Sequence, residues 1–158
     1  MLDKEDLEEL KALLKEEFDD YYELAGGKNY RYHHLVRTHR YVKKIMNREE
    51  IEGLDFDSEV LEVAALLHDI GRKEDIEEGF LNPMEGENRE HAERGAELVS
   101  EYIEGFLDEE QVEKVEKVIR NHHGEPETVE GKIVQDCDAL SNFCVNNLLR
   151  MIHYSADK

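Results

Sequence analysis

The chain has 158 residues, which suits one compact domain and leaves too few for a second. Its 40 acidic and 20 basic side chains give a formal charge of −20, which repels nucleic-acid backbones and argues against generic DNA or RNA binding. A small phosphorylated substrate stays compatible with this charge, because a bound divalent metal and a few arginines can reverse the potential inside one cleft. No apolar run approaches the about 18 residues that span a bilayer, and no signal-peptide pattern begins the chain, so we expect a cytoplasmic protein that binds no membrane.

Helical periodicity dominates the first half of the chain. Apolar residues spaced by three and four predict an N-terminal packing helix within residues 1–27, ending at Gly26 and Gly27: Leu7, Leu10, Leu14, Phe18, Tyr21 and Ala25. A second helix is expected at about residues 31–48. A third begins at Asp57 or Ser58, whose side chain can cap free amides, and Gly71 suits its C-terminal exit. The polar residues 72–88 predict a long loop with room for a short hairpin, and loops of this length often cover sites.

The second half predicts three more helices. Asn88 can cap a helix that Gly105 ends, and residues 108–111 resemble a capping box before an apolar stripe that finishes at His122. Thr128 starts a final long helix with these core positions: Ile133, Cys137, Leu140, Cys144 and Leu148. Cys137 and Cys144 would lie about 10.5 Å apart on it, too far for a disulfide. No alternating strand pattern competes, so we predict an all-α, single-domain bundle of about five to seven helices over residues 1–158.

Histidines and aspartates recur near the ends of these helices. His68 and Asp69 close an apolar segment, where an ionised aspartate is costly to bury without a partner. Further candidates stand along the chain: His33, His34, His39, His91, His122, His123, Asp136 and Asp138. Two imidazoles with two carboxylates suit Mn²⁺, Fe²⁺, Co²⁺, Ni²⁺ or Zn²⁺, whereas Mg²⁺ prefers more oxygen ligands. Ligands from different helices would also couple metal binding to stability.

Over about residues 30–145 these motifs resemble the HD-domain metal-dependent phosphohydrolases, in particular the small single-domain members. His34-Leu-Val-Arg37-Thr38 matches the His-x-x-Arg-Val motif except for threonine, residues 65–71 match the central His-Asp motif, and residues 136–140 resemble the closing Asp-Ala-Asp-x-Leu. The resemblance implies that one metal is bound by His34, His68, Asp69 and Asp138. It also implies that His91 and His122 contact phosphate or bind a second metal.

The resemblance is weaker to two branches of that family, which bears on the substrate. Hydrolases of guanosine tetraphosphate carry Glu-Asp soon after the His-Asp pair, whereas Glu74 and Asp75 come two positions late here. Hydrolases of cyclic dinucleotides carry Gly-Tyr-Pro after the double histidine, and residues 124–128 do not reproduce it. The resemblance therefore indicates a small phosphorylated substrate, with nucleotides preferred by analogy alone.

The function implied is that of a nucleotidase, phosphodiesterase or pyrophosphohydrolase that uses metal-activated water. Asp69, His91, His122 and Arg72 are the candidate catalytic residues, and Arg37 could also offset phosphoryl charge. Three alternatives stay open for the site: His39 could replace His34, Asp136 could replace Asp138 or support an imidazole, and His123 could join His122 in a binuclear arrangement. A silent metal- and nucleotide-binding sensor, or a helical interaction protein, is the competing function, and a homodimer is compatible with the sequence.

Overall fold

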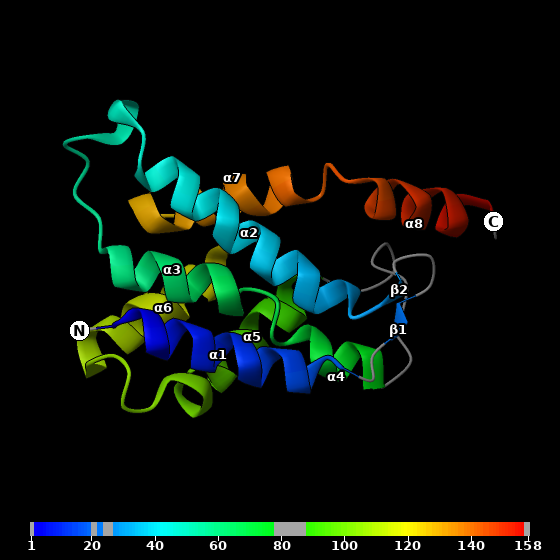
Figure 1. Ribbon diagram of the computed structural model, residues 1–158, viewed down its shortest axis with the longest axis horizontal. Coiled ribbons are helices and arrows are strands. Elements are labelled where there is room, and N and C mark those ends of the chain that lie inside the picture. Colours follow the sequence, from blue (N-terminus) through cyan, green and yellow to red (C-terminus); the bar gives the residue numbers. More distant parts are fainter. Residues whose placement is uncertain (1, 20–21, 24–26, 78–87, 157–158) are drawn as a thin grey trace.

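The computed structural model describes residues 2–19, 22–23, 27–77 and 88–156 and is helical almost throughout (Figure 1). In chain order its elements are α1 (Lys4–Glu17), β1 (Tyr22–Glu23), β2 (Gly27–Lys28), α2 (Tyr30–Met46), the 3₁₀ helix η1 (Glu49–Ile51), α3 (Ser58–Leu67), α4 (Arg72–Glu77), α5 (Asn88–Ile103), α6 (Glu109–Asn121), α7 (Val129–Ser141) and α8 (Val145–Ala156). The predicted all-α class is confirmed. The described residues hold one α-helix more than the predicted range.

Helix α3 lies at the centre of the bundle. Its seven residues from Val60 to Leu67, Glu62 excepted, are fully buried, and α2, α6 and α7 pack around it. Helices α5 and α6 pack against each other, and α1 covers α2 and α5 with Leu7, Leu10 and Leu14 in the common core. Because seven of the ten residues of α3 are apolar and buried, its C-terminal end carries His68 and Asp69 into the middle of the molecule.

The predicted helix starts are confirmed by their hydrogen bonds. Asp57 caps α3 by accepting from the backbone amides of Glu59 and Val60. Asp108 and Gln111 form both bonds of a capping box before α6, and Thr128 caps α7. Each such cap is typically worth about 1 kcal/mol of stability, so these short polar side chains fix where the site-bearing helices begin.

Three expectations about segment boundaries need correction. Helix α1 ends at Glu17, and the two-stranded antiparallel sheet β1–β2 begins within the range given to the first helix, where Tyr21 and Ala25 fall outside the described residues. The predicted loop 72–88 begins with α4, while residues 78–87 fall outside the described residues. The predicted final helix is two helices, because the chain leaves helical geometry between Ser141 and Val145.

The break between α7 and α8 has a local cause. The side-chain amide of Asn142 donates to the backbone carbonyl of Asp138 at 3.1 Å and to its Oδ1 at 3.2 Å, so it ends α7 in the way asparagine commonly does. Of the predicted core positions, Ile133 and Cys137 are buried, whereas Leu140 and Leu148 are exposed. Cys137 and Cys144 are free, as predicted.

One structural finding bears on the expectation that the protein binds no membrane. Among the described helices, none combines the length and the apolar character that crossing a bilayer requires.

Candidate metal centre

Five helices bring histidines and aspartates to one buried position. Helix α2 supplies His34, the turn after α3 supplies His68 and Asp69, α5 supplies His91, and the C-terminal end of α6 supplies His122. These side chains are buried, and Asp138 reaches them from α7. The turn after α3 lets neighbouring residues 68 and 69 face the same centre, which two adjacent positions inside a helix would not do.

The first cluster surrounds the Nε2 atoms of His34 and His68, which lie 3.2 Å apart. Asp138 Oδ1 is 3.0 Å from His34 Nε2 and 3.6 Å from His68 Nε2. Asp69 Oδ2 is 3.4 Å and 3.8 Å from the same two nitrogens. Two nitrogens and two carboxylate oxygens therefore share one small volume.

The second cluster lies on the other side of the Asp69 carboxylate. Asp69 Oδ1 is 3.2 Å from His91 Nε2 and 3.8 Å from His122 Nε2, and His123 Nε2 is 3.0 Å from His91 Nε2. Ligand-capable atoms of Asp69, His91, His122 and His123 all lie within 4.8 Å of one another. The two oxygens of one aspartate therefore face two separate groups of imidazoles.

The distances fit metal coordination better than direct hydrogen bonding. Donor atoms about 2.1 Å from one ion are separated by about 3.0 Å at right angles and about 4.2 Å when opposite each other. Separations of 3.0–3.8 Å in the first cluster fall in this interval. His122 Nε2 is buried and has no hydrogen-bond partner among the described residues, which is costly unless another group satisfies it. The donor set thus fits one divalent ion in each cluster.

Hydrogen bonds on the far side of the rings orient the imidazoles. His68 Nδ1 lies 2.9 Å from the carbonyl oxygen of Ala65 and donates to it, and His122 Nδ1 donates to the carbonyl oxygen of Ile119. A proton on Nδ1 leaves the lone pair on Nε2, so both rings present an acceptor to the clusters.

The charged neighbours hold the two aspartates ionised. Burial opposes ionisation of Asp69, but the charge of Arg31 and the neighbouring imidazoles together outweigh it and hold the pKa of Asp69 well below its usual value. Burial acts in the same sense on Asp138, where hydrogen bonds with His34 and His68 lower the pKa far below the usual range. Both carboxylates are therefore negatively charged over the whole neutral range, as a cation site requires.

Comparisons with known proteins agree with this geometry. The sequence matches the model of the HD domain family over residues 31–142, which is more than half of the chain. The chain belongs to the HD-domain family. A similar solved structure is the crystal structure of a predicted HD superfamily hydrolase from an uncultured Thermotogales bacterium, with 30% sequence identity, a TM-score of 0.69, and coverage of 93% of this chain and 74% of the other. A search of curated proteins gives no match.

The HD-domain structure brings together the residues that the sequence singled out for the metal, His34, His68, Asp69 and Asp138. His91 and His122 lie beside them, and Arg72 Nε is 3.9 Å from Asp69 Oδ1. The other candidate ligands named from the sequence do not join the first cluster. His39 pairs with Glu62 at 2.9 Å, while His33 and Asp136 are exposed. His123 is exposed yet joins the second cluster, as the binuclear alternative required.

Two residues of the HD-domain centre were not singled out from the sequence. Arg31 forms a buried ion pair with Asp69, and Ser141 contacts His34. The sequence did offer a signal for Arg31, because it lies one helical turn before His34 and so on the same helix face. It also lies within residues 24–48, which contain no acidic residue. The same stretch contains seven of the 20 basic residues of the chain: Lys28, Arg31, Arg37, Arg40, Lys43, Lys44 and Arg48. Arg37 donates from Nε to the carbonyl oxygen of Ser141 at 2.9 Å and so ties α2 to the end of α7.

Ser141 is expected to set the orientation of His34. Its hydroxyl donates to the carbonyl oxygen of Asp138 at 2.9 Å, so it accepts the Nδ1 proton of His34 at 2.8 Å. Replacing Ser141 with alanine should weaken Mn²⁺ or Co²⁺ binding by about 10- to 100-fold, as the loss of such ring partners typically does. Calorimetric titration of metal into the metal-free protein measures it. Ser141→Thr, which keeps the hydroxyl, should restore affinity, and the exposed Ser100→Ala should leave it unchanged; wild-type affinity in Ser141→Ala would contradict the role.

The imidazoles of the two clusters should respond differently to acid. For His34, burial lowers the pKa, but hydrogen bonds with Asp138 and Asp69 outweigh it and leave the pKa above its ordinary value. Burial lowers the pKa of His91 to about 3 and, together with the charge of His122, that of His123 to about 4. Protons therefore compete for His34 first as the pH falls, whereas His91 and His123 stay neutral.

We expect the affinity for the first ion to fall as the pH is lowered from about 8 to about 6, with proton release on binding, and the affinity for the second ion to change less over that interval. Calorimetric titrations in buffers of different ionisation enthalpy count the released protons. Equal pH dependence of the two binding events would contradict the assignment.

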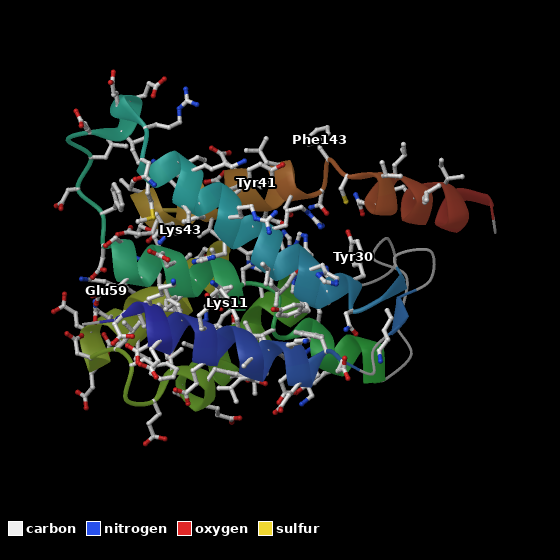
Figure 2. The ribbon with its side chains drawn as sticks, viewed as in Figure 1. Lys11, Tyr30, Tyr41, Lys43, Glu59 and Phe143 are labelled. Atoms are coloured by element: carbon white, nitrogen blue, oxygen red, sulfur yellow. The ribbon has the colours of Figure 1, made fainter. Side chains whose placement is uncertain are left out.

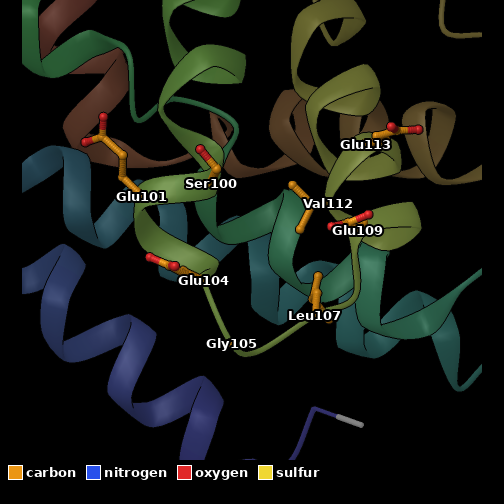
Figure 3. A pocket seen from close by; sticks show the side chains of 8 residues that line it. All are labelled: Ser100, Glu101, Glu104, Gly105, Leu107, Glu109, Val112 and Glu113. Atoms are coloured by element: carbon orange, nitrogen blue, oxygen red, sulfur yellow. The ribbon is translucent and has the colours of Figure 1, made fainter.

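Two cavities differ in their suitability for an anionic substrate. One, of about 800 Å³, opens beside the second cluster and is lined by His123, Arg120 and Asn121 together with Ala92, Glu93, Gly124 and Glu125. Another, of about 620 Å³, lies between α5 and α6 and is lined by four glutamates, Ser100, Gly105, Leu107 and Val112 (Figure 3). Four carboxylates repel an anion, and the lining contains no residue of either cluster, so the first cavity is the candidate substrate site.

Proposed function

We propose that this chain is a metal-dependent phosphohydrolase that cleaves a phosphoester or pyrophosphate bond of a small phosphorylated substrate, most plausibly a nucleotide. The observation that carries the proposal is the Asp69 carboxylate, whose Oδ2 faces His34 and His68 while its Oδ1 faces His91 and His122. This arrangement suits two divalent ions that share one aspartate. The hydrolase description of the Thermotogales relative supports the same reaction class.

A first ion would be held by His34, His68, Asp69 and Asp138, and a second by Asp69, His91, His122 and His123. A bound divalent ion supplies Lewis-acid stabilisation of phosphoryl charge and makes water acidic enough to attack phosphorus at neutral pH. Candidate metals are Mn, Fe, Co, Ni, Zn and Mg, among which the imidazole-rich donor set favours the transition metals. Each cluster has enough donor atoms to bind one ion. The proposed reaction needs no nucleophilic side chain.

The arginines and histidines of the chain have proposed roles in binding the phosphoryl group. Arg31 and Arg72, both next to Asp69, would offset the charge of the phosphoryl oxygens. His91 has a pKa lowered by burial to about 3, so its imidazole is neutral near pH 7 and suits metal ligation better than proton donation. His123 reaches solvent beside the cavity, which places it where the rest of the substrate would lie.

Two further features support a nucleotide-sized anionic substrate. The cavity beside His123 has a volume of about 800 Å³, within the range of about 300–1,000 Å³ that is typical of small-molecule sites. In the acid-free residues 24–48, Lys28, Lys43 and Arg48 pair with carboxylates away from the centre, whereas Arg31 lies at the centre beside Asp69. A guanidinium at this position suits a phosphorylated compound.

Turnover of a substrate panel tests the proposal. Metal-free protein is loaded with each divalent metal in turn and mixed with nucleoside mono-, di- and triphosphates, a cyclic nucleotide and aryl phosphate mono- and diesters. We expect release of phosphate or of a nucleotide product with at least one metal, and none after chelation. Metal-dependent nucleotide binding without turnover across the panel would favour a sensor module, and absence of bound metal would contradict both.

A further inference from the structure

Helix α8 projects from the bundle instead of packing on it. It extends past the other helices, at the red end of the chain (Figure 1), and makes only sparse contacts with the rest of the described residues. Its attachment is at its first turn, where Asn147 accepts a hydrogen bond from the Tyr30 hydroxyl at 3.2 Å and donates to the carbonyl oxygen of Asn142 at 3.1 Å. Beyond this turn, Leu148, Leu149 and Ile152 are exposed.

Apolar side chains are concentrated on this projecting part. Most of the large apolar side chains that the described residues expose lie between positions 140 and 152. Phe143, in the connection before α8, is 86% exposed and points away from the bundle (Figure 2). On α8 itself the apolar face consists of Val145, Leu148, Leu149 and Ile152, which are 50–71% exposed. A contiguous group of exposed apolar side chains of this size marks an interaction surface.

The apolar face of α8 has the geometry of a packing surface. At 100° per residue its four members fall within an arc of about 100°, which is the width of the apolar stripe on helices that pack against a core. A helix of 12 residues is marginally stable in water by itself. The stripe and the short length both indicate that α8 is stabilised by contact with another surface.

The charge pattern indicates what that surface is. The chain has 40 acidic residues, yet residues 139–156 contain no aspartate or glutamate. A second copy of the chain, also carrying a charge of −20, is repelled least where acidic residues are absent from both partners. The α8 region meets this condition, and a two-fold axis would place two identical apolar faces against each other.

We propose that α8 and the preceding Phe143 form a homodimer interface, in which the apolar face of α8 packs against its symmetry mate. A stable interface buries about 800 Å² on each partner, so Leu140 and Phe143 would extend the contact beyond the two α8 helices. An anionic membrane fits less well, because the negative chain is repelled by it and interfacial helices are usually rich in Lys and Arg, of which α8 has one, Arg150.

Sedimentation of the full chain, from micromolar to submillimolar concentrations, tests the interface. We expect the wild type to have twice the chain mass of 18.5 kDa, and Leu149→Glu and Ile152→Glu to shift the mass to that of one chain. Leu54→Glu is the matched control, because Leu54 is 48% exposed and Leu149 is 50% exposed, but Leu54 lies outside α8. The control should remain dimeric.

Hydrogen exchange provides a second measurement that does not depend on the variants. Dilution of the wild type below its dissociation constant should remove the protection of α8 amides while the helices of the bundle stay protected. A wild type that is monomeric at every concentration, or variants that remain dimeric, would overturn the proposal. Flotation of monomeric wild type with phosphatidylglycerol and phosphatidylcholine vesicles, lost in Leu149→Glu, would overturn it in favour of a lipid surface. None of these readouts depends on turnover, so the interface and the phosphohydrolase activity can fail separately.

Discussion

Asp69→Asn is expected to abolish turnover and to lower the metal content of both clusters. Asp69 contributes one oxygen to the histidines of each cluster, and an amide is a far weaker ligand than a carboxylate. Loss of a partner that only orients a ligand costs about 10- to 100-fold, so loss of a shared ligand should exceed about 100-fold in activity and in metal affinity. Elemental analysis of metal-loaded protein and phosphate release from the active substrate measure the two effects.

The number of ions lost from the Asp69→Asn variant tests whether the aspartate is shared. A bridging Asp69 predicts that both ions are weakened together, whereas an Asp69 that serves the first cluster alone predicts that one ion per chain is kept at wild-type affinity. Asp136→Asn is the matched control, because Asp136 is an exposed carboxylate on the same helix as Asp138 and should not affect either ion. Full activity in Asp69→Asn would contradict the proposed function.

The same substitution should also lower the stability of the metal-free protein. Arg31 forms a buried ion pair with Asp69, and removing one partner of such a pair leaves a buried charge uncompensated. The free energy of unfolding should fall by up to about 3–5 kcal/mol, as broken buried pairs typically show. Urea denaturation in the presence of chelator isolates this effect from that of the metal.

The sequence predicted the helices that carry the candidate residues because those helices obey local rules. The cap residues Asp57, Asp108 and Thr128 determine where three helices begin, and the apolar periodicity of each helix determines which side faces inward. The polar residues that interrupt those apolar sides, such as His68 and Asp69, are then brought to the centre by the packing itself. Helical phase indicates that these side chains converge, whereas the choice of His34, His68, Asp69 and Asp138 as ligands came from the resemblance to HD-domain motifs.

Features that depend on contacts distant in sequence were not predictable in the same way. Ser141 is 107 positions from His34, and nothing in its own segment indicates that its hydroxyl contacts an imidazole. The end of α7 depends on Asn142 bonding back to Asp138, a choice that asparagine also makes in loops and turns. Leu140 and Leu148 continue the helical stripe of α7 in sequence but not in space, because the chain breaks between them. Periodicity alone does not reveal such a break.

Gly71 also has a role in the structure different from the one its position suggested. Glycine after a helix commonly adopts positive φ, but among the described glycines only Gly53 and Gly105 do so. A Cβ atom on Gly71 would lie 2.1 Å from the carbonyl oxygen of His91 and 2.7 Å from the amide nitrogen of Gly95. Gly71 is therefore required by the close approach of two backbones, where the turn after α3 meets α5.

Gly71→Ala is accordingly expected to be strongly destabilising. Neither contact can be relieved by rotating a side chain, since both involve backbone atoms, so α5 must move away from the end of α3. Overpacking typically costs about 1–3 kcal/mol, and a clash with rigid backbone should reach or exceed the upper value. Because His91 is on the displaced segment, the second cluster should lose metal affinity more than the first. Urea denaturation and metal titration measure the two effects.

Gly124→Ala provides the comparison that isolates the backbone contact. A Cβ atom there meets only the carbonyl oxygen of Asn121, at 3.6 Å, which is an ordinary contact distance. Alanine should therefore be tolerated or should stabilise the fold by about 0.4–1 kcal/mol through the unfolded state. Equal unfolding free energies for the two variants would show that α5 can separate from the turn after α3 at little cost. In that case the spacing between Asp69 and His91 would not be set by Gly71, and the rigidity of the second cluster would have to come from α6 alone.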